Sequence, residues 1–520
     1  MIFNFSYHRK WFIFVVALIY TGLFNLPFIL KRLYIHNIFS SQLLYSIIIE
    51  NIISIIITWI LFYSLTIHKN VFALFTILIF IITALAKYFL INLGLNVTIS
   101  TISAVFATDL NEAKDFFNIS ILIEVILALM IAIISIKIFY KYYTRSTKFQ
   151  KIISSSCLLL TLLGTTLNGA KINAKYYPYN ILKETIYYTL NQLNWHTSRQ
   201  DITNVYKFNL KENDAQNLIV VLVIGESARF DHFAINGYDK PTTPYLSQIP
   251  NLLSFQNVES CAAMTMDAVP CIMTRSNNQD RSIGRKETSF VSVLRKLGFH
   301  TLWLGSQGSS SFNRHYYEFG KEAEHHLYID DFITSSTKPQ FDTDLLPYME
   351  QFIDKSGKKL IVFHSIGSHF HYDLRAPSNF QIFIPTCKLD FKHKNLNNCS
   401  QEQIINSYDN SILYTDFFLA KIINLLEKKN ALFFYISDHG ESLGENGIYM
   451  HGNNNIKEQI HIPMFVFASE YYRKNHPTYF NNMKSKLHTP ISQDNIFHSI
   501  LDCSFVTSDV INKNLSICQK

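Results

Sequence analysis

The sequence predicts a five-helix transmembrane bundle followed by an α/β sandwich whose central sheet is mostly parallel. Hydrophobic residues make up 48% of the 520 residues and charged residues only 16%, against ~25% charged residues in an average soluble protein. The shortage of charge is confined to the first 170 residues, which are long apolar runs with short polar breaks. After residue 216, short apolar segments alternate with amphipathic ones, and this alternation is typical of an α/β domain.

Five apolar stretches in the first 170 residues predict membrane-spanning helices. Each approaches or exceeds the ~20 residues that a helix needs to cross the hydrocarbon core of a bilayer. Any one of them could be a buried helix of a soluble protein, but five in succession, almost free of charge, favour a transmembrane domain over residues 1–170. The stretches cover residues 11–30, 43–66, 71–93, 119–140 and 152–169.

Basic residues between the stretches predict the orientation in the membrane. The segment 141–151 holds four Lys or Arg residues, whereas 96–118 holds three acidic ones. Because Lys and Arg are retained on the cytoplasmic side, we expect the N-terminus and 141–151 to be cytoplasmic, although Lys31 and Arg32 oppose this orientation. An odd number of spans then places the C-terminal domain outside. We therefore expect a multi-pass membrane protein whose C-terminal domain lies outside, which is the periplasm if the source is a Gram-negative bacterium.

Four continuous apolar runs predict the strands of the α/β domain, because strands covered on both faces of a parallel sheet lack polar alternation. Residues 171–215 are polar and mostly helical in pattern, so we expect them to form a bridge along the membrane surface and the α/β domain to cover 216–520. In sheets of this kind, ligands bind outside the carboxyl ends of the strands. The four runs are 218–224, 300–304, 359–365 and 431–437.

Polar residues follow three of these runs and are candidate metal ligands. Glu226 follows the first run, His369 follows the third, and Asp438 and His439 follow the fourth. A single carboxylate at a strand end is often only a helix cap. Four oxygen and nitrogen ligands delivered to one rim are harder to explain as caps. Since no thiolate is among them, they fit a catalytic rather than a structural zinc site.

Thr265 is a candidate nucleophile in the segment 260–271. It lies between Cys261 and Cys271 and follows another predicted strand, 252–258. A helix that begins near Thr265 would offer its backbone amides to a phosphate oxygen. Taken alone, a threonine of this kind is more often a surface hydroxyl or a helix cap, and only its neighbourhood favours the nucleophile.

Several motifs together make the chain resemble the lipopolysaccharide and lipid A phosphoethanolamine transferases of the alkaline phosphatase/sulfatase superfamily. The resemblance spans nearly the whole chain, and its most specific part is the run at 438–452. It implies a sulfatase-like catalytic domain with zinc held by Glu226, Thr265, Asp438 and His439. The matching segments are VIGESARFDHFAINGYDKPTTPYL (223–246), SCAAMTMDAVPC (260–271), GSH (367–369), SDHGESLGENGIYMHG (437–452) and FATDLNEA (106–113).

The resemblance also implies roles for residues around this zinc site. His369 and His451 would hold a second zinc ion or the substrate phosphate, with His364 as a weaker candidate. Further contacts with substrate are implied for Thr108, Glu112 and Gln307.

Six of the seven cysteines lie in the C-terminal half, and only Cys157 lies in a predicted span. An even number of cysteines in an exported domain is typical of disulfides. Short sequence separations make ring closure inexpensive, and the resemblance supports the first two of the predicted pairs. The predicted pairs are Cys261–Cys271, Cys387–Cys399 and Cys503–Cys518.

The implied reaction is transfer of phosphoethanolamine from phosphatidylethanolamine to lipid A or to the lipopolysaccharide core. Thr265 would attack the donor phosphorus, diacylglycerol would leave, and an acceptor oxygen would take the group from the covalent phosphothreonine. The resemblance implies one tightly bound zinc ion and allows a second. It also implies a monomer among membrane lipids and a part in polymyxin resistance.

The sequence departs from the best-known lipid A branch in three places, which leaves the acceptor open. Cys261-Ala262-Ala263 replaces the usual Cys-Gly-Thr, and Ala104 stands where Asn is usual. The segment 303–310 lacks the Asn-Asn and Lys of that branch and is closer to relatives that act on core sugars.

Other functions stay open at this point. A relative in the superfamily could transfer glycerophosphate, and a catalytically inactive membrane sensor could keep the fold. A sulfatase would need a formylglycine made from the Cys of C-x-P-x-R, but Cys271-Ile-Met-Thr-Arg275 lacks the Pro. The net charge of +7 is modest and no basic cluster stands out, so we do not expect nucleic-acid binding.

Overall fold

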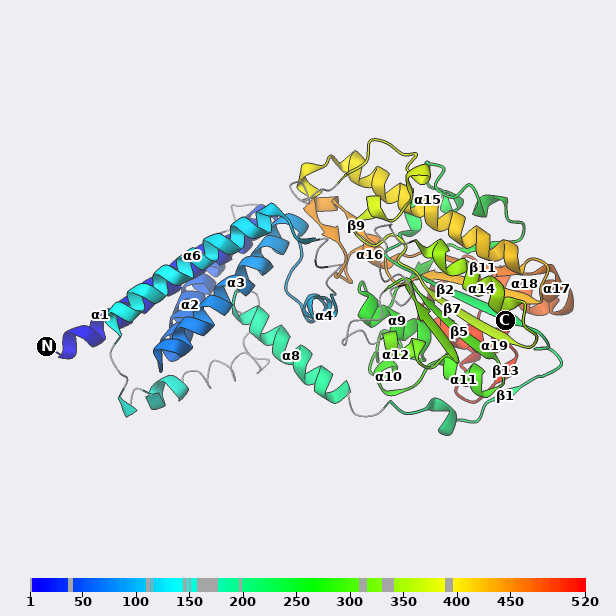
Figure 1. Cartoon of the computed structure of the whole chain (residues 1–520), viewed down its shortest axis with the longest axis horizontal. Helices are drawn as coiled ribbons and strands as arrows, with labels where there is room; N and C mark the ends of the chain where they lie inside the picture. Colours follow the sequence, from blue (N-terminus) through cyan, green and yellow to red (C-terminus); the bar gives the residue numbers. More distant parts are fainter. Residues whose placement is uncertain are drawn as a thin grey trace. The chain divides into compact units, whose positions relative to one another are not determined.

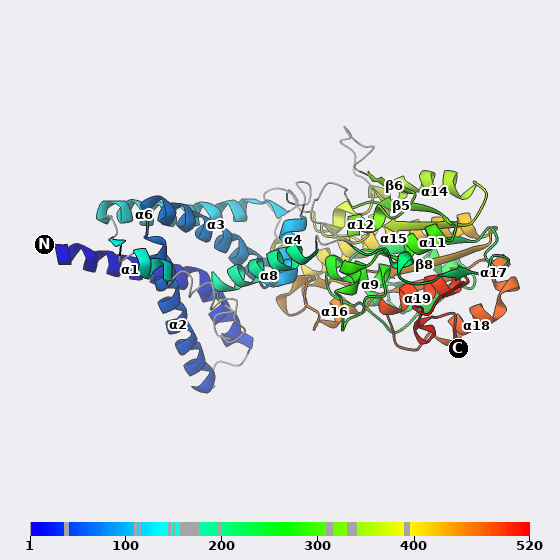
Figure 2. The same cartoon turned by 90° about the horizontal axis from the view of Figure 1, so that it is seen from below.

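The chain forms two compact units, shown in Figure 1 and, turned by 90°, in Figure 2. The helical unit comprises Met1–Val105, Phe116–Leu193 and Asp390–Asn395. The sheet unit comprises Phe106–Asp115, Asn194–Leu389 and Leu396–Lys520. The structure, a computed structural model, describes residues 2–35, 41–108, 113, 116–143, 147–148, 151–156, 176–195, 199–307, 316–329, 341–388 and 396–520.

Four long apolar helices make up most of the helical unit, and each is long and apolar enough to cross a membrane. They coincide with the first four predicted spans. The fifth predicted span, 152–169, is described only as far as residue 156, so the five-helix count stays a prediction. The four helices are α1 (Ile2–Ile35), α2 (Ser41–Leu65), α3 (Lys69–Leu93) and α6 (Ile119–Tyr142).

Polar groups inside this bundle pair with one another. Lys87 on α3 lies 3.1 and 3.3 Å from the two carboxylate oxygens of Glu124 on α6. Asn118, the residue before α6, donates to the hydroxyl of Tyr88 on α3 at 2.7 Å. Because an ionised group is costly within a span, these pairs fasten α3 to α6 without leaving a lone charge.

Two further helices lie in the connecting segments, and one of them was predicted. The helix expected between 171 and 215 is α8 (Tyr179–Trp195), while its place along a membrane surface stays a prediction. The start of α8 is tied to α1, since the Tyr177 amide donates to Asn25 Oδ1 at 2.9 Å. The shorter α4 (Ile99–Ala107) follows α3.

A seven-stranded mixed sheet is the centre of the sheet unit, with strand order β3-β11-β8-β2-β7-β5-β6. The strands from β8 to β6 are parallel, and β11 is antiparallel to both of its neighbours. The four predicted runs form β2, β5, β7 and β8, and 252–258 supplies β3, whereas β6 and β11 were not predicted. The bounds are β2 Ile219–Gly225, β3 Leu253–Phe255, β5 His300–Gly305, β6 His325–Tyr328, β7 Lys359–His364, β8 Ala431–Ser437 and β11 Met464–Ala468.

Helices cover both faces of this sheet (Figures 1 and 2). One face packs against α9, α11 and α19 through a single apolar core. The long α15 lies over the other face, where Phe418 contacts Phe363 of β7. The helices of the sheet unit are α9 (Thr265–Met273), α10 (Ile283–Lys286), α11 (Phe290–Lys296), α12 (Tyr316–Gly320), α14 (Leu346–Ile353), α15 (Gln401–Leu426), α16 (Lys457–Ile460), α17 (Glu470–Asn475), α18 (Pro477–Ser485) and α19 (Asp494–Cys503).

Three pairs of two-residue strands complete the sheet unit. The pairs β1–β13 and β9–β10 are antiparallel, and β4–β12 is parallel. Their bounds are β1 Asn209–Leu210, β4 Val258–Glu259, β9 Ser442–Leu443, β10 Tyr449–Met450, β12 Ile491–Ser492 and β13 Val506–Thr507.

Three disulfides join the cysteines of the sheet unit in the predicted pairs. They link Cys261 to Cys271, Cys387 to Cys399 and Cys503 to Cys518. Cys271 is therefore not a free thiol, and conversion to formylglycine would need that bond to be absent.

The parallel arrangement of β7, β2 and β8 brings their carboxyl ends side by side. Ile224 of β2 pairs with His364 of β7 on one side and with Ile436 of β8 on the other. Gly225 pairs with Ser437, the last residue of β8. Side chains that follow these three strands are thereby delivered to one rim.

Candidate active site

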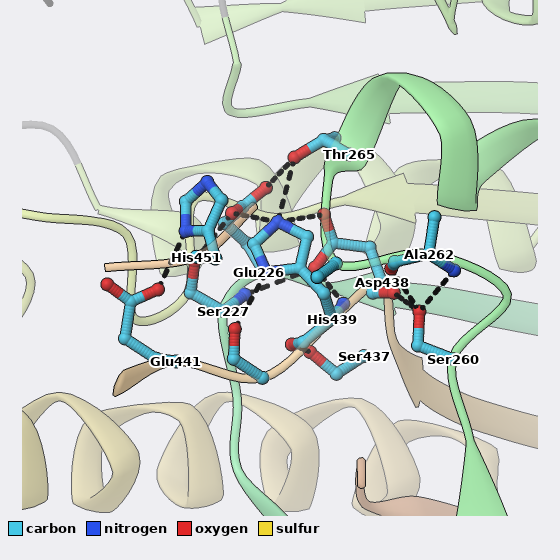
Figure 3. A network of polar contacts seen from close by, with 12 residues as sticks. Glu226, Ser227, Ser260, Ala262, Thr265, Ser437, Asp438, His439, Glu441 and His451 are labelled. Atoms are coloured by element: carbon cyan, nitrogen blue, oxygen red, sulfur yellow. Dashed lines mark hydrogen bonds and ion pairs between the residues drawn. The ribbon is translucent and has the colours of Figure 1, made fainter. Parts of the chain in front are cut away.

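Two carboxylates lie side by side at this rim, and both are buried. Glu226 follows β2 and is 1% exposed, and Asp438 follows β8 and is 0% exposed. Their positions are set by the sheet, since the Asp438 amide donates to the Gly225 carbonyl at 3.0 Å. Figure 3 shows the network of polar contacts around them.

The Glu226 carboxylate is fixed by neutral donors on both oxygens. Ser227 Oγ donates to Oε1 at 2.8 Å, and Gln307 Nε2 donates to Oε2 at 2.7 Å. Gln307 also donates to the Ser365 carbonyl at 3.1 Å. Gln307 therefore orients the carboxylate, and its predicted contact with substrate stays a prediction.

Asp438 uses only one of its oxygens in hydrogen bonds. Oδ1 accepts from the backbone amides of Ser227 at 3.1 Å and His439 at 2.6 Å. Oδ2 has no hydrogen-bond donor among the residues that the structure describes. Its nearest basic atom is His439 Nε2, at 3.3 Å.

The two carboxylates need a cation to be stable as a pair. Burial, and after it the charge of Glu226, raises the pKa of Asp438 well above its usual value. The ligand atoms of Glu226, Asp438 and His439 lie within 4.8 Å of one another. A buried carboxylate oxygen without a donor, a second carboxylate and an imidazole nitrogen fit a divalent metal ion such as zinc.

The Thr265 hydroxyl lies directly above this group of ligands (Figure 3). Thr265 is the first residue of α9, as expected for a helix that begins near it. Its Oγ1 lies 3.2 Å from Glu226 Oε2 and 3.2 Å from His439 Nε2. Thr265 is a partly exposed residue, whereas Glu226, Asp438 and His439 beneath it are buried.

A second group of side chains adjoins the first. The ring centroid of His451 lies 4.0 Å from that of His439 and 6.4 Å from that of His369. His451 Nδ1 lies 2.7 Å from Glu441 Oε2, and the Tyr372 hydroxyl donates to Glu441 Oε1 at 2.7 Å. Burial raises the pKa of Glu441 to about 7.

His369 reaches the site because the chain passes close to Glu226. Gly367 has φ +45°, and a Cβ atom there would lie 2.9 Å from the Glu226 carbonyl oxygen. The Ser368 amide donates to that same oxygen at 3.0 Å. Only glycine fits this position without displacing Glu226, which explains the Gly in the segment 367–369.

The predicted residues thus divide into two sets. Glu226, Thr265, Asp438 and His439 form one group, with His369 and His451 beside it. Gln307 also lies in the site, where it contacts Glu226, and the other predicted residues lie elsewhere or are not described. His364 is the buried last residue of β7 and, among described residues, belongs to neither ligand group. Thr108 follows α4 and is partly buried, and Glu112 lies outside the described residues, so contacts of both with substrate stay predictions.

Sequence reasoning missed three side chains that organise the site. Ser227 and Glu441 stand directly after predicted strands, so their positions were a signal, but no pattern pairs either of them with its partner. Tyr372 lies in a loop with no strand or motif to mark it.

The family of the protein follows from residues 219–504, more than half of the chain, which match the family model described as Sulfatase. The chain therefore belongs to the sulfatase family. Residues 55–181 match a second model, described as Phosphoethanolamine transferase EptA/EptB. The two matches together place the chain among the phosphoethanolamine transferases of that family.

Two curated relatives show how far the similarity extends. Phosphoethanolamine transferase EptA of Helicobacter pylori is 36% identical over 300 residues, which are 54% of this chain and 52% of that protein. The alignment thus spans about half the length of this relative. Kdo(2)-lipid A phosphoethanolamine 7''-transferase of Salmonella typhimurium is 26% identical over 525 residues, covering 91% of this chain and 90% of the relative.

Two solved structures share the fold. The integral membrane lipooligosaccharide phosphoethanolamine transferase A of Neisseria meningitidis aligns with a TM-score of 0.81 at 22% identity, over 97% of both chains. The periplasmic domain of Escherichia coli EptC, solved as a complex with Zn, aligns with a TM-score of 0.53 at 23% identity, over 60% of this chain and 89% of that one.

Proposed function

We propose that the protein transfers phosphoethanolamine from phosphatidylethanolamine to lipid A or to the lipopolysaccharide core, through a covalent intermediate on Thr265. One observation carries the proposal: the hydroxyl of the partly exposed residue Thr265 lies 3.2 Å from both Glu226 and His439, above buried ligands that fit a divalent metal ion. The names of both curated relatives include phosphoethanolamine transfer, and one specifies Kdo(2)-lipid A as acceptor.

Zinc is the cofactor we propose for this site. Glu226, Asp438 and His439 would hold it together with Thr265 Oγ1, and the absence of thiolates from this set suits a catalytic zinc. The Zn complex of the E. coli EptC domain supports this choice. When bound, zinc would supply Lewis-acid activation of the Thr265 hydroxyl and offset the charge of the phosphate.

In the first displacement, Thr265 Oγ1 attacks the phosphorus of phosphatidylethanolamine. The Oγ1–P bond forms, the bond from phosphorus to the glycerol oxygen breaks, and diacylglycerol leaves. Glu226 Oε2, which accepts a hydrogen bond from this hydroxyl at 3.2 Å, is placed to take its proton. The balance is completed when the departing glycerol oxygen gains a proton. His369 and His451 would hold the phosphate oxygens, or a second zinc ion.

In the second displacement, an oxygen of the acceptor attacks the phosphorus of the phosphothreonine. The bond from Thr265 Oγ1 to phosphorus breaks, the threonine oxygen regains a proton, and phosphoethanolamine ends on the acceptor. Donor and acceptor are both lipids, which explains a catalytic domain at 216–520 joined by 171–215 to a transmembrane domain at 1–170. We propose a monomer in a bacterial inner membrane with the catalytic domain in the periplasm.

Replacing Thr265 with Ala tests the proposal. The full-length protein is reconstituted in vesicles that contain fluorescent phosphatidylethanolamine, with lipid A or lipopolysaccharide core as acceptor. Wild-type protein should release diacylglycerol, modify the acceptor and carry a phosphoethanolamine adduct on Thr265 by mass spectrometry. Thr265→Ala should reduce both half-reactions to the detection limit, because both use the same oxygen.

Thr265→Ser is the matched control, because it keeps an oxygen but loses the methyl group that restricts χ1. It should retain part of the turnover. If Thr265 only caps α9, the Ala variant would lose about 1 kcal/mol of stability and keep its turnover. An adduct on another residue would also contradict the mechanism.

The acceptor is decided by mass spectrometry of lipid A and core from cells with and without the gene. A mass increase on lipid A alone or on core alone would assign it. Loss of lipid A modification should also increase polymyxin sensitivity, because each added ethanolamine carries a positive charge. Transfer of glycerophosphate would point to the alternative donor. The Cys261–Cys271 disulfide argues against a formylglycine sulfatase.

A further inference from the structure

Three histidines of the site share one hydrogen-bond arrangement. Nδ1 of His439 lies 2.8 Å from the Gly440 carbonyl oxygen, and Nδ1 of His369 lies 2.8 Å from the Phe370 carbonyl oxygen. A carbonyl oxygen only accepts hydrogen bonds, so Nδ1 must carry the proton in both rings. Nε2 is then the nitrogen offered to the site, and in His439 it lies 3.2 Å from Thr265 Oγ1.

His451 follows the same arrangement with a different acceptor. Its Nδ1 lies 2.7 Å from Glu441 Oε2, ten residues away in the chain. The carbonyl acceptors of the other two histidines belong to the next residue and are supplied by the local backbone. The orientation of His451 depends instead on a tertiary contact with a side-chain carboxylate, and Figure 3 shows Nδ1 turned toward Glu441.

Glu441 is itself held in one position. It is fully buried, and its other oxygen accepts from the Tyr372 hydroxyl at 2.7 Å. The Tyr372 ring packs edge-on against the Tyr408 ring, with 5.2 Å between the ring centroids. The Tyr408 hydroxyl donates to the Ser227 carbonyl at 2.6 Å. The chain of contacts therefore runs from the backbone beside Glu226 to the His451 ring.

The backbone of His451 is placed by its neighbours but does not fix the ring. Met450 has φ +65° and Gly452 has φ +117°, so the chain turns sharply on either side of it. Gln459 Nε2 donates to the Met450 carbonyl at 3.0 Å. These contacts hold the main chain, whereas the choice of ring nitrogen is made by the Glu441 carboxylate.

We propose that Glu441 is a positioning residue for the transfer reaction: its carboxylate holds the Nδ1–H of His451, so that the imidazole presents Nε2 to the phosphoryl group. Tyr372 supports it by fixing the second carboxylate oxygen. The inference rests on the proposed function and adds two residues to it. A carboxylate behind a functional histidine fixes its ring orientation and tautomer, and losing such a partner typically costs 10–100-fold in activity.

The test is Glu441→Gln in the full-length protein, assayed with fluorescent phosphatidylethanolamine in vesicles. Gln keeps the size of the side chain but replaces the carboxylate with one accepting oxygen and an NH2 donor, so the charged acceptor behind His451 Nδ1–H is lost. We expect kcat to fall by about 10–100-fold, while KM for the donor, the zinc content and the thermal midpoint stay at wild-type values. Glu445→Gln is the matched control, since Glu445 lies in the same loop but binds Arg229 and the Leu443 amide. It should keep wild-type kcat.

A double-mutant cycle with Tyr372→Phe separates positioning from a general structural role. Tyr372→Phe should lower kcat a few-fold, and adding it to Glu441→Gln should cause no further loss, because both act through one carboxylate. If the fold-losses in kcat of the two single variants multiply in the double variant, the inference is overturned. A wild-type kcat for Glu441→Gln would also overturn it. If Glu441→Gln loses zinc or stability, the test rests on the single variant Tyr372→Phe. A wild-type kcat in that variant would then overturn the inference. A wild-type protein without transfer activity would instead overturn the proposed function.

Discussion

Charged side chains pair in opposite ways in the two units of this protein. In the helical unit, Lys87 lies 3.1 and 3.3 Å from the carboxylate oxygens of Glu124, and the two charges cancel. In the sheet unit, Glu226 and Asp438 have the same sign and share one buried rim. Asp438 Oδ2 finds no donor among the residues that the structure describes.

The difference separates a structural pair from a functional one. Two opposite charges neutralise each other without a further partner, although moving them out of water costs much of the free energy that their attraction supplies. Two close buried carboxylates must either share a proton or bind a cation, and the second option makes them a candidate metal site. The two pairs differ in burial, since the Lys87 and Glu124 side chains are 13% and 32% exposed whereas Glu226 and Asp438 are buried. They differ also in the sign of the partner.

Among the variants that test the difference between the two pairs, Asp438→Asn should have the largest effect. The change keeps the shape of the side chain and removes one of the charges that a dication needs. Turnover should fall by at least ~100-fold, and zinc per chain, measured by atomic emission, should fall with it. The circular dichroism spectrum should stay that of the wild type.

The control for this variant is Asp416→Asn, the same substitution at a buried carboxylate on α15. It should leave the zinc content unchanged. Wild-type zinc and turnover in Asp438→Asn would mean that the carboxylate pair does not hold the metal.

A smaller effect is expected when the opposite-charge pair is broken. Lys87→Leu leaves Glu124 alone within a span, which should cost about 3 kcal/mol of unfolding free energy in mixed micelles. The double variant with Glu124→Leu removes both charges and should recover most of that loss. A double variant as unstable as the single one would show that the two charges do not compensate each other.

The smallest effect concerns a buried carboxylate with donors of its own. Asp416 accepts from the amides of Tyr245 and Leu246, each at 2.8 Å. Burial raises its pKa from 3.8 to about 7. The folded state therefore binds this proton more tightly than the unfolded state. The resulting stabilisation is complete below pH ~4 and is lost as the pH rises through about 7.

Asp416→Asn removes this titration. The unfolding midpoint of the variant should fall less than that of the wild type between pH 4 and 7, as measured by thermal unfolding in a pH series. A steeper fall in the variant would show that the carboxylate is stabilised in its charged form.

The sequence was sufficient to predict an element when the residues of that element indicate its surroundings. Uninterrupted apolar runs predicted β2, β5, β7 and β8, because a strand covered on both faces must be apolar throughout. The parallel order of these strands then placed Glu226, Asp438 and His439 at one rim. The strand β11 was missed, although its five apolar residues follow the same rule.

Only the tertiary structure decided which side chains meet at the site. Gln307 donates to Glu226 across 81 residues, and the Tyr372 hydroxyl reaches Glu441 across 69. No periodicity connects such residues, since a hydrogen bond between loops depends on where the whole sheet places both of them. By itself the sequence predicted β2, β5, β7 and β8 and named candidate residues that follow three of these strands. The packing of distant loops determined the orientation of those residues, because hydrogen-bond distances are set by the fold and not by spacing along the chain.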